Sequence, residues 1–496
     1  MKESENFKFE DHIRHFFKET SHTDPAEAGP AQGKGNTEPS IQDIQFDIKP
    51  SELIAYLKNY IVGQDKGIET LATKICTHFH RMKLEMNNPK LSRIIGNVKS
   101  NILMIGPTGV GKTYLVRLIA NKLKVPFVKG DATKFSETGY VGGDVEDLVR
   151  ELVHQVGGNI RLAELGIIYI DEIDKIASSL NWTGPDVSRG GVQRNLLKLM
   201  EETDVDMRVP HDLSSQMEAM LETQRTGKAA RKRVNTRNIL FIMSGAFNNL
   251  PEIIAQRLKT GGMGFTGEKL PSHIETEYLL DHLHTQDLVK FGYEAEFVGR
   301  LPIITYLNDL TEEGLYEILQ NPNSAVILGK KRDFASYGID LTFSDQALRL
   351  IAKQAILHKT GARGLVTVIE KMLLPFEKSL PSSNIKELHI TPDLINSSEQ
   401  VINRMIMDSA FKEFAEQFAQ DSGIEIEFSE GAIKAINRIA LKEGKSVESV
   451  LQNILEDYKY GLTLVGKTNL KITNTLIQDP KGYLDRLVKQ SYRKEE

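Results

Sequence analysis

Short apolar runs separated by longer helical patterns follow one another along the chain from about residue 41. Four runs carry the pattern: NILMI at 101–105, VPFV at 125–128, IIYI at 167–170 and ILFIM at 239–243. Runs of four or five apolar residues between helical patterns are typical of buried strands in a largely parallel sheet. We therefore predict an α/β fold with a parallel sheet for residues 41–309.

Strand-like runs become sparse beyond this region, and helical periodicity dominates the rest of the chain. We expect a small, mainly α-helical domain over residues 310–400. Within it, GIDLTFS at 338–344 recurs as GIEIEFS at 423–429, and the apolar register continues past both segments. A repeat at so long a distance indicates a duplicated domain, unless two helix-rich segments resemble each other by chance. We interpret residues 401–496 as a C-terminal extension that is a degenerate copy of the small domain.

Residues 1–40 have a different pattern from the rest of the chain. The segment FKFEDHIRHFFKETSH at 7–22 places its apolar residues near one face of a short helix. The stretch from 23 to 40 is rich in proline, glycine and small polar residues, which is typical of a flexible linker. The helix can pack on the body of the protein or dock to a partner, and the sequence leaves both interpretations open.

Composition narrows the class of protein. The chain has 496 residues and a net charge of -5, a near-neutral balance that argues against a surface built to bind nucleic acid. The single cysteine, Cys76, excludes an intramolecular disulfide and a Cys-rich zinc module, and it indicates a reducing compartment. Apolar runs fall short of the ~18 residues that a membrane span needs. We expect a cytoplasmic protein with no zinc and no membrane association.

The strongest motif is GPTGVGKT at 106–113, which fits the pattern G-x-x-x-x-G-K-[ST] between an apolar run and a helical pattern. The backbone N–H groups of such a loop cradle phosphates at a helix N-terminus. We expect Lys112 to neutralise the β- and γ-phosphates of ATP, and the Thr113 hydroxyl to bind Mg²⁺. The expected nucleotide contacts are Pro107, Thr108, Gly109, Val110, Gly111, Lys112 and Thr113.

Two carboxylates, Asp171 and Glu172, follow directly after the run IIYI. In a parallel sheet this position lies at the same edge as the phosphate loop. Asp171 can then hold Mg²⁺, while Glu172 polarises a water molecule for in-line attack on the γ-phosphate. The pair can instead cap the next helix, but its combination with the phosphate loop favours ATP hydrolysis.

Four motifs, taken together and in order, extend this interpretation: GPTGVGKT, IIYIDEIDKI, FGYEAEFVGRLPII and KTGARGL. From about Ile54 to Leu394 the chain resembles the ClpX family of AAA+ unfoldases. The resemblance implies an ATPase with a P-loop AAA+ core, assembled as a ring that is commonly a hexamer. ATP is then expected between the large and small domains and against the neighbouring subunit.

The resemblance also implies roles for single residues. Arg300 matches the family's arginine finger, which stabilises charge on ATP bound in the adjacent subunit. Arg363 resembles the sensor-2 arginine, and Ser244 takes the place of sensor 1 at the exit of the last predicted strand. The segment that resembles the family's adenine-contacting region contains Ile61, Val62 and Gly63.

Further matches concern a substrate and a peptidase. Tyr140 and Val141 stand between glycines, and they match the family's first pore loop. An apolar pair on a loop is unusual for a monomer, whereas in a ring its copies can grip an extended polypeptide. Arg189 resembles part of the second pore loop. The family's peptidase-docking loop corresponds to Met263, Gly264 and Phe265.

The chain also departs from the family pattern. The family's N-terminal zinc-binding domain needs more cysteines than this sequence has, and Glu448 aligns with Arg363 in the second small-domain-like segment. That segment has therefore lost the sensor arginine, and we expect an assembly or partner-binding role for it. A basic stretch that ends in Arg231, Lys232 and Arg233 can contact substrate or be a solvated loop.

The sequence thus predicts a protein unfoldase that uses ATP and Mg²⁺ to thread unfolded or tagged protein substrates through the pore of a homohexamer. A separate ClpP-like peptidase would then receive the substrates. One alternative is a stand-alone remodelling chaperone without a peptidase. Another is a nucleic-acid motor on the same core, against which the acidic net charge and the Tyr140-Val141 pair argue.

Overall fold

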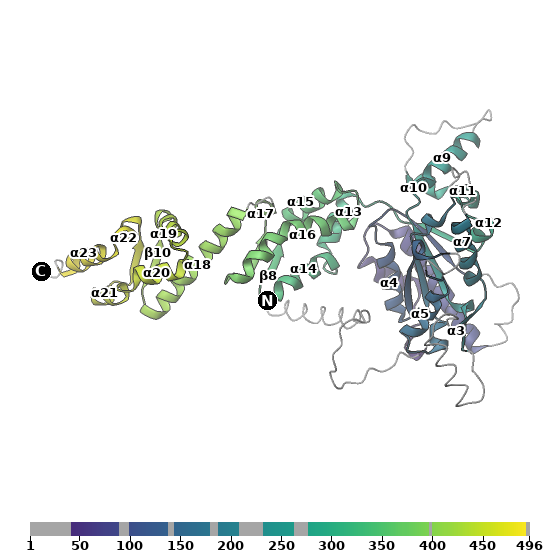
Figure 1. Ribbon diagram of the computed structural model, residues 1–496, viewed down its shortest axis with the longest axis horizontal. Helices are drawn as coiled ribbons and strands as arrows, with labels where there is room; N and C mark the ends of the chain where they lie inside the picture. Colours follow the sequence, from purple (N-terminus) through teal and green to yellow (C-terminus); the bar gives the residue numbers. More distant parts are fainter. Residues whose placement is uncertain are drawn as a thin grey trace. The chain divides into compact units, whose positions relative to one another are not determined.

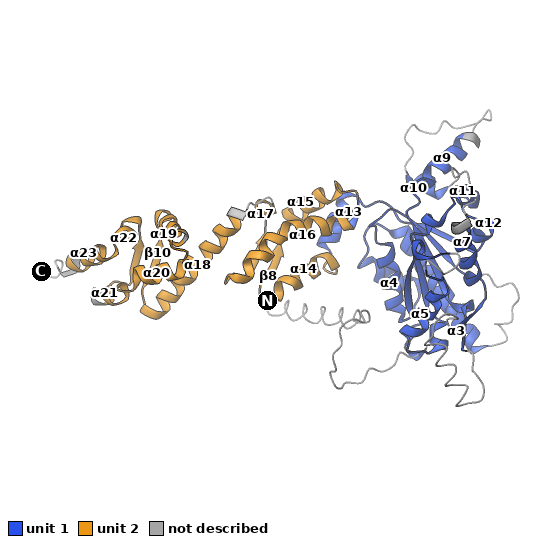
Figure 2. Ribbon diagram, in the orientation of Figure 1, with its two compact units in different colours: residues 1–321, 360–362 blue, residues 322–359, 363–496 orange. Residues whose placement is uncertain are grey.

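The computed structural model describes residues 41–88, 99–136, 143–178, 187–207, 232–261, 276–395 and 399–492 (Figure 1). These residues divide into two compact units (Figure 2). The first reaches Asn321 and includes Thr360–Ala362, and the second comprises Pro322–Lys359 and the residues from Arg363 onward. Each unit is described below by itself.

A five-stranded sheet with the order β2-β3-β6-β1-β7 forms the centre of the first unit, and all its strand pairs are parallel. Its strands are β1 (Ile102–Ile105), β2 (Phe127–Asp131), β3 (Ile167–Asp171), β6 (Leu240–Gly245) and β7 (Ile303–Tyr306). The four apolar runs of the sequence supply the first four of these strands. The predicted α/β class with a parallel sheet is therefore confirmed.

Helices lie against both faces of this sheet (Figure 1). All residues of β1 and β6 are buried, which explains why Ile102–Ile105 and Leu240–Met243 are continuous apolar runs rather than alternating patterns. The longer helices are α2 (Pro50–Lys58), α3 (Asp65–Asn87), α4 (Lys112–Leu123), α5 (Asp147–Gln155), α7 (Val187–Met200), α9 (Leu250–Gly261) and α13 (Glu312–Gln320). The short ones are α6 (Ile160–Ala163), α10 (Thr276–Asp281), α11 (Thr285–Phe291) and α12 (Ala295–Gly299).

Smaller elements complete the first unit. Strands β4 (Asp204–Asp206) and β5 (Arg233–Asn235) pair in the antiparallel sense. Short 3-10 turns occur at η1 (Ile41–Asp43), η3 (Ala132–Lys134), η4 (Ile173–Ile176) and η5 (Thr236–Asn238).

The second unit begins with α14 (Ala325–Ala335), β8 (Asp340–Phe343) and α15 (Asp345–Ile356), and continues with α16 (Ala362–Ser379), η6 (Leu380–Ser382), β9 (Glu387–Ile390) and α17 (Pro392–Ile395). The elements that follow are α18 (Glu399–Ser422), β10 (Glu425–Phe428), α19 (Glu430–Glu443), α20 (Val447–Leu455), α21 (Tyr458–Leu464), β11 (Asn469–Ile472), α22 (Asn474–Gln478) and α23 (Pro480–Tyr492). Helices dominate both stretches.

The repeated sequence segments have the same local structure. Strands β8 and β9 form a parallel pair, and so do β10 and β11. The Ser344 hydroxyl caps α15 by accepting a hydrogen bond from the amide of Ala347 at 3.2 Å, and the Ser429 hydroxyl caps α19 through Ala432 at 3.3 Å. The two segments thus share a strand, a capped helix and a returning parallel strand.

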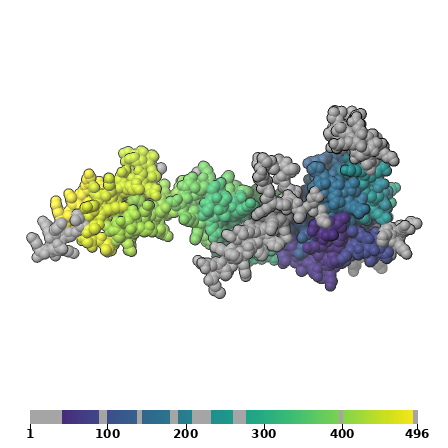
Figure 3. Space-filling model, turned by 90° about the horizontal axis from the view of Figure 1, so that it is seen from below, coloured from purple at the N-terminus to yellow at the C-terminus, as the bar shows by residue number. Residues whose placement is uncertain are grey.

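The segment from α18 to α23 has a hydrophobic core of its own. Ile436, Leu451, Leu462, Ile472 and Leu476 are all fully buried within it. Their side chains come from five different elements, and the segment forms one body in the space-filling view (green to yellow in Figure 3). In the part of the chain that the structure describes, no helix is long and apolar enough to span a membrane.

Candidate nucleotide-binding site

The glycine-rich motif joins β1 to α4, as the sequence predicts. It leaves β1 after Ile105, and α4 begins at Lys112. Gly109 and Gly111 have φ angles of 82° and 96°, a left-handed conformation that glycine adopts without the strain a side chain would cause. The loop therefore curls over the N-terminus of a 12-residue helix, where free backbone amides favour an anion.

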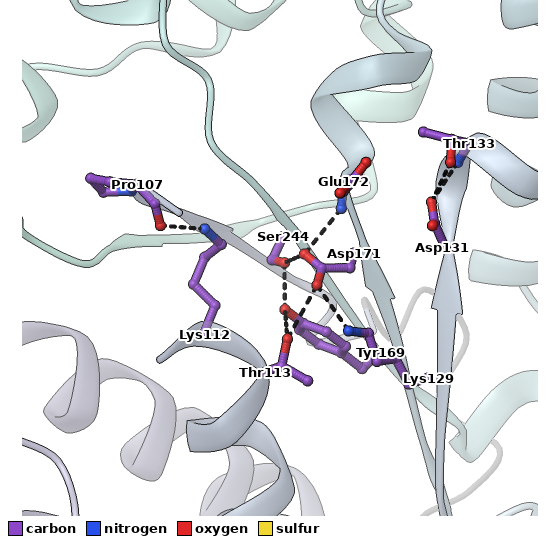
Figure 4. Close-up of polar contacts among 10 residues, drawn as sticks. All are labelled: Pro107, Lys112, Thr113, Lys129, Asp131, Thr133, Tyr169, Asp171, Glu172 and Ser244. Carbon is purple, nitrogen blue, oxygen red and sulfur yellow. Dashed lines mark hydrogen bonds and ion pairs between the residues drawn. The ribbon is translucent and has the colours of Figure 1, made fainter. Parts of the chain in front are cut away.

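The Lys112 ammonium group points back over this loop (Figure 4). It donates to the carbonyl oxygen of Pro107 at 2.7 Å and also to that of Gly106. Its positive charge therefore lies at the mouth of the loop, where bound phosphates would be neutralised.

Asp171 is the centre of a polar network at the end of β3 (Figure 4). Its Oδ2 accepts a hydrogen bond from the Thr113 hydroxyl at 3.1 Å, and its Oδ1 accepts one from the Ser244 hydroxyl at 2.8 Å. The Tyr169 hydroxyl lies 2.5 Å from Ser244 Oγ and 3.2 Å from Thr113 Oγ1. Three elements, α4, β3 and β6, thus meet at one carboxylate.

The electrostatics keep Asp171 ionised. Its partial burial favours the neutral form, but hydrogen bonds from Ser244 and Lys129, together with the lysine charge, outweigh burial and lower the pKa of Asp171. Burial raises the pKa of the neighbouring Tyr169, so this phenol stays protonated. A carboxylate beside a threonine hydroxyl is a set of hard oxygen donors, and it suits Mg²⁺.

The backbone conformation of Glu172 differs from that of Asp171. It adopts φ 56° and ψ 32°, a left-handed conformation that is uncommon for a residue with a side chain. Its amide donates to Asp171 Oδ1 at 3.1 Å, and its side chain is exposed. The sharp turn after β3 therefore separates the two carboxylates, with Asp171 in the network and Glu172 free to meet a water molecule.

The segment predicted to contact adenine lies close to the phosphate loop. Ile61 is buried, and its Cδ1 atom lies 3.8 Å from the position that a β-carbon on Gly111 would take. The following Gln64 holds the segment in place, because its amide group exchanges two hydrogen bonds with the backbone of Asn308, at 2.8 and 2.9 Å. Ile61 therefore lies beside the phosphate loop, and the adenine-contacting role of Ile61, Val62 and Gly63 stays a prediction.

Two family models match the chain in succession. Residues 97–304 match an AAA domain (Cdc48 subfamily). Residues 310–380 match the C-terminal, D2-small domain, of ClpB protein. The first match contains β1, β2, β3 and β6, the phosphate loop and the Asp171 network.

The region that matches this chain spans most of the length of each curated relative. The protein "ATP-dependent Clp protease ATP-binding subunit ClpX" of Treponema denticola is 39% identical over 364 residues, which are 72% of this chain and 84% of the relative. Proteins of the same name are 38% identical in Bacteroides thetaiotaomicron (70% of this chain, 80% of the relative) and 36% identical in Bacteroides fragilis (73% and 83%). The chain belongs to the ClpX family. It is therefore an AAA+ ATPase, as the sequence predicts.

A short segment from the ClpX-like KTGARGL motif contacts the phosphate loop. The amide of Ala362 donates to the carbonyl oxygen of Gly109 at 2.9 Å, and a β-carbon on Gly361 would lie 2.7 Å from the same oxygen. Residues 360–362 thus belong to the first unit. Arg363 belongs to the second unit, and its sensor role stays a prediction.

Arg300 lies at the C-terminal end of α12, and half of its side chain is exposed. Its guanidinium group makes an ion pair with Glu201 at 2.6 Å, and its carbonyl oxygen accepts a hydrogen bond from the Asn101 amide at 3.0 Å. An exposed arginine at this surface is compatible with action on a neighbouring subunit, which stays a prediction.

Several predicted residues lie outside the described residues: Tyr140, Val141, Arg231, Met263, Gly264 and Phe265. Arg189 lies in α7, but its side chain is not described. The pore-loop and peptidase-docking roles therefore stay predictions.

Sequence reasoning missed three residues of the site. Tyr169 is one of the apolar residues of the strand pattern, and its hydroxyl joins Thr113 to Ser244. The Asp174 carboxylate accepts a hydrogen bond from the amide of Ala246 at 3.2 Å, just beyond the end of β6. Lys129 makes an ion pair with Asp171 at 3.2 Å. Lys129 could have been recognised in the sequence, because it is a charged residue within β2, the strand that pairs with β3 and its Asp171.

Proposed function

We propose that this protein is the ATP-driven unfoldase subunit of a Clp-type protease. The observation that carries the proposal is the meeting of Thr113, Asp171 and Ser244 beside a phosphate loop, in a member of the ClpX family. We further propose that the protein acts as a homohexamer in the cytoplasm and passes substrates to a ClpP-like peptidase.

In this proposal the site holds ATP together with Mg²⁺, which supplies charge neutralisation at the phosphates. Thr113 and Asp171, whose side-chain oxygen atoms lie 3.1 Å apart, would hold the metal. Lys112 and the backbone amides of the loop bind the phosphates. Ser244 orients the Asp171 carboxylate through its 2.8 Å hydrogen bond.

Hydrolysis requires a base for the attacking water and charge stabilisation at the γ-phosphate. Glu172 accepts the proton of the water, because its side chain is exposed next to the network rather than tied into it. Arg300 acts on ATP in the neighbouring subunit, and Arg363 senses ATP in its own chain. Ile61, Val62 and Gly63 contact the adenine.

The hydrolysis energy is used on polypeptides. Tyr140 and Val141 grip the chain in the pore with the help of Arg189, and Met263, Gly264 and Phe265 dock the peptidase. We propose three domains: an ATPase domain at 41–309, a small domain at 310–400 and a degenerate small-domain copy at 401–496. The last serves assembly or partner binding, and the helix and linker predicted for residues 1–40 lie outside the described residues.

ATP turnover in the presence of candidate substrates tests the proposal. We expect an unfolded polypeptide to stimulate ATP hydrolysis, and single- or double-stranded DNA to leave it unchanged. The Glu172→Gln variant should bind ATP and assemble, but hydrolyse it about 100-fold or more slowly, because the general base is lost. Stimulation by DNA alone would instead indicate a nucleic-acid motor, and undiminished turnover in Glu172→Gln would remove Glu172 as the base.

A further inference from the structure

Lys129 brings a second positive charge into the nucleotide site. It lies on β2 opposite Tyr169 in the strand register, and its ammonium group is 3.2 Å from Asp171 Oδ2. The same oxygen accepts the hydrogen bond of Thr113 at 3.1 Å. The lysine and the threonine thus converge on one carboxylate oxygen from two different elements (Figure 4).

Fold stability gives no strong reason for a lysine at this position. Its neighbours Val128 and Gly130 are buried, whereas 39% of the Lys129 side chain is exposed to solvent. An ion pair with this much exposure contributes little to the free energy of folding. The main effect of the contact is therefore that Lys129 partly neutralises the charge of Asp171.

The acidic residue of β2 itself, Asp131, is engaged elsewhere. Asp131 Oδ1 accepts hydrogen bonds from the amide and the hydroxyl of Thr133, at 2.9 and 2.6 Å. Asp171 has only 19% of its side chain exposed, and it is the carboxylate with which Lys129 makes an ion pair. The ammonium group is thus directed at the acid that we assign to Mg²⁺.

A lysine ammonium is a compact point charge, and it opposes a second cation at the same carboxylate. Divalent metal binding at Asp171 must either displace the ammonium group or accept its repulsion. Bound phosphates reduce this conflict, because their negative charge attracts both cations. A bound nucleotide therefore raises the affinity of the site for the metal more than it would if no ammonium group lay beside the carboxylate.

We propose that Lys129 is a positioning residue that competes with Mg²⁺ for Asp171, so that the metal is held well only together with nucleotide. The inference rests on the proposed magnesium role of Thr113 and Asp171. It predicts that removal of the ammonium group makes the site bind Mg²⁺ more readily.

Binding of a fluorescent, non-hydrolysable ATP analogue to the full chain, titrated with Mg²⁺ from an EDTA-treated start, tests the proposal. Lys129→Met should lower the Mg²⁺ concentration at half-maximal binding by about three- to tenfold. Lys129→Arg should keep the wild-type value, since it retains the charge. Lys83→Met, which removes a lysine paired with Asp47 at the surface, serves as the matched control and should also keep it.

A combined variant shows whether the effect passes through Asp171. In an Asp171→Asn background, Lys129→Met should no longer change the Mg²⁺ midpoint. An unchanged midpoint in Lys129→Met, with normal Mg²⁺ dependence in the wild type, would overturn the competition. Nucleotide binding that is independent of Mg²⁺ in the wild type and in Asp171→Asn would instead contradict the proposed metal site itself.

Discussion

At the scale of single residues, three hydroxyl groups, those of Thr113, Tyr169 and Ser244, organise the polar network around Asp171. The buried Tyr169 side chain brings a polar tip to Thr113 and Ser244, and both of these also bond Asp171. Each donor fixes the carboxylate from a different direction. The network is therefore positioned before any ligand arrives, which reduces the cost of ordering the site on binding.

His78 gives a prediction of pH dependence at the residue scale. It is buried in α3, its Nε2 lies 3.1 Å from the carbonyl oxygen of Asn238, and its Nδ1 has no hydrogen-bond partner. Burial lowers the pKa of His78 from 6.5 to about 3, and the positive charges of Arg81 and Lys99 add to this effect.

The sign follows from the unfolded state, which binds the proton first because its histidine pKa is higher. Stability is retained above pH 6.5 and falls as the pH decreases from 6.5 toward 3. Between pH 7.5 and 5.5, the wild type should lose about 1.4 kcal/mol more unfolding free energy than His78→Gln, which does not titrate. Urea unfolding, monitored through hydrogen exchange of the α3 amides, measures this difference in unfolding free energy. Parallel losses in the two proteins would contradict a neutral His78.

At the element scale, the contact between residues 360–362 and the phosphate loop has a sharp steric requirement. Gly361 has a φ angle of 58°, and a β-carbon there would lie 2.7 Å from Gly109 O. We expect Gly361→Ala to weaken binding of a fluorescent ATP analogue by about tenfold, because the loop must shift.

Gly338→Ala is the control for this prediction. Gly338 has a similar φ angle of 75°, but a β-carbon there meets no atom within 4 Å. The control carries comparable backbone strain without the clash, and it should leave ATP affinity unchanged. Equal affinities in the two variants would show that the contact does not matter for the loop.

The C-terminal segment gives a second prediction at this scale. Because it has its own core, residues 399–496 should unfold cooperatively when expressed alone. Leu451 is fully buried, so Leu451→Ala should reduce the unfolding free energy of this segment by about 2–5 kcal/mol. Tyr460, with 81% of its surface exposed, is the control, and Tyr460→Ala should change it by about 0.5 kcal/mol or less. Equal effects would mean that the segment is not a packed domain.

Some elements could be predicted from sequence because burial leaves a local pattern. The four apolar runs became strands, and the phosphate-loop motif became a strand, a loop and a helix. β7 was missed because its sequence IITY is only partly buried and mixes polar with apolar residues. The strand order was not predictable either, since pairing depends on contacts between distant segments.

The same reason separates the predicted part of the site from the missed part. Lys112, Thr113 and Asp171 lie in motifs whose residues are neighbours in sequence. The ion pair of Lys129 with Asp171 depends on the register between β2 and β3, which the sequence of either strand alone does not reveal.

At the scale of the whole molecule, ATP hydrolysis in this ClpX-family protein is expected to drive the unfolding of other proteins. The phosphate loop and the Asp171 network lie in the first unit, whereas Arg363 lies in the second, and the sensor role of Arg363 stays a prediction. The predicted role of Arg300 would extend this dependence to a neighbouring subunit.

The most direct measurement is the loss of fluorescence of a tagged, stably folded reporter protein, mixed with this protein, a ClpP-type peptidase and ATP. We predict that fluorescence is lost only with ATP, that Glu172→Gln abolishes the loss and that Tyr140→Ala slows it strongly. Phe265→Ala should preserve ATP hydrolysis but prevent degradation of the reporter. A reporter that stays folded while ATP is hydrolysed, or one that unfolds equally with Glu172→Gln, would contradict the account.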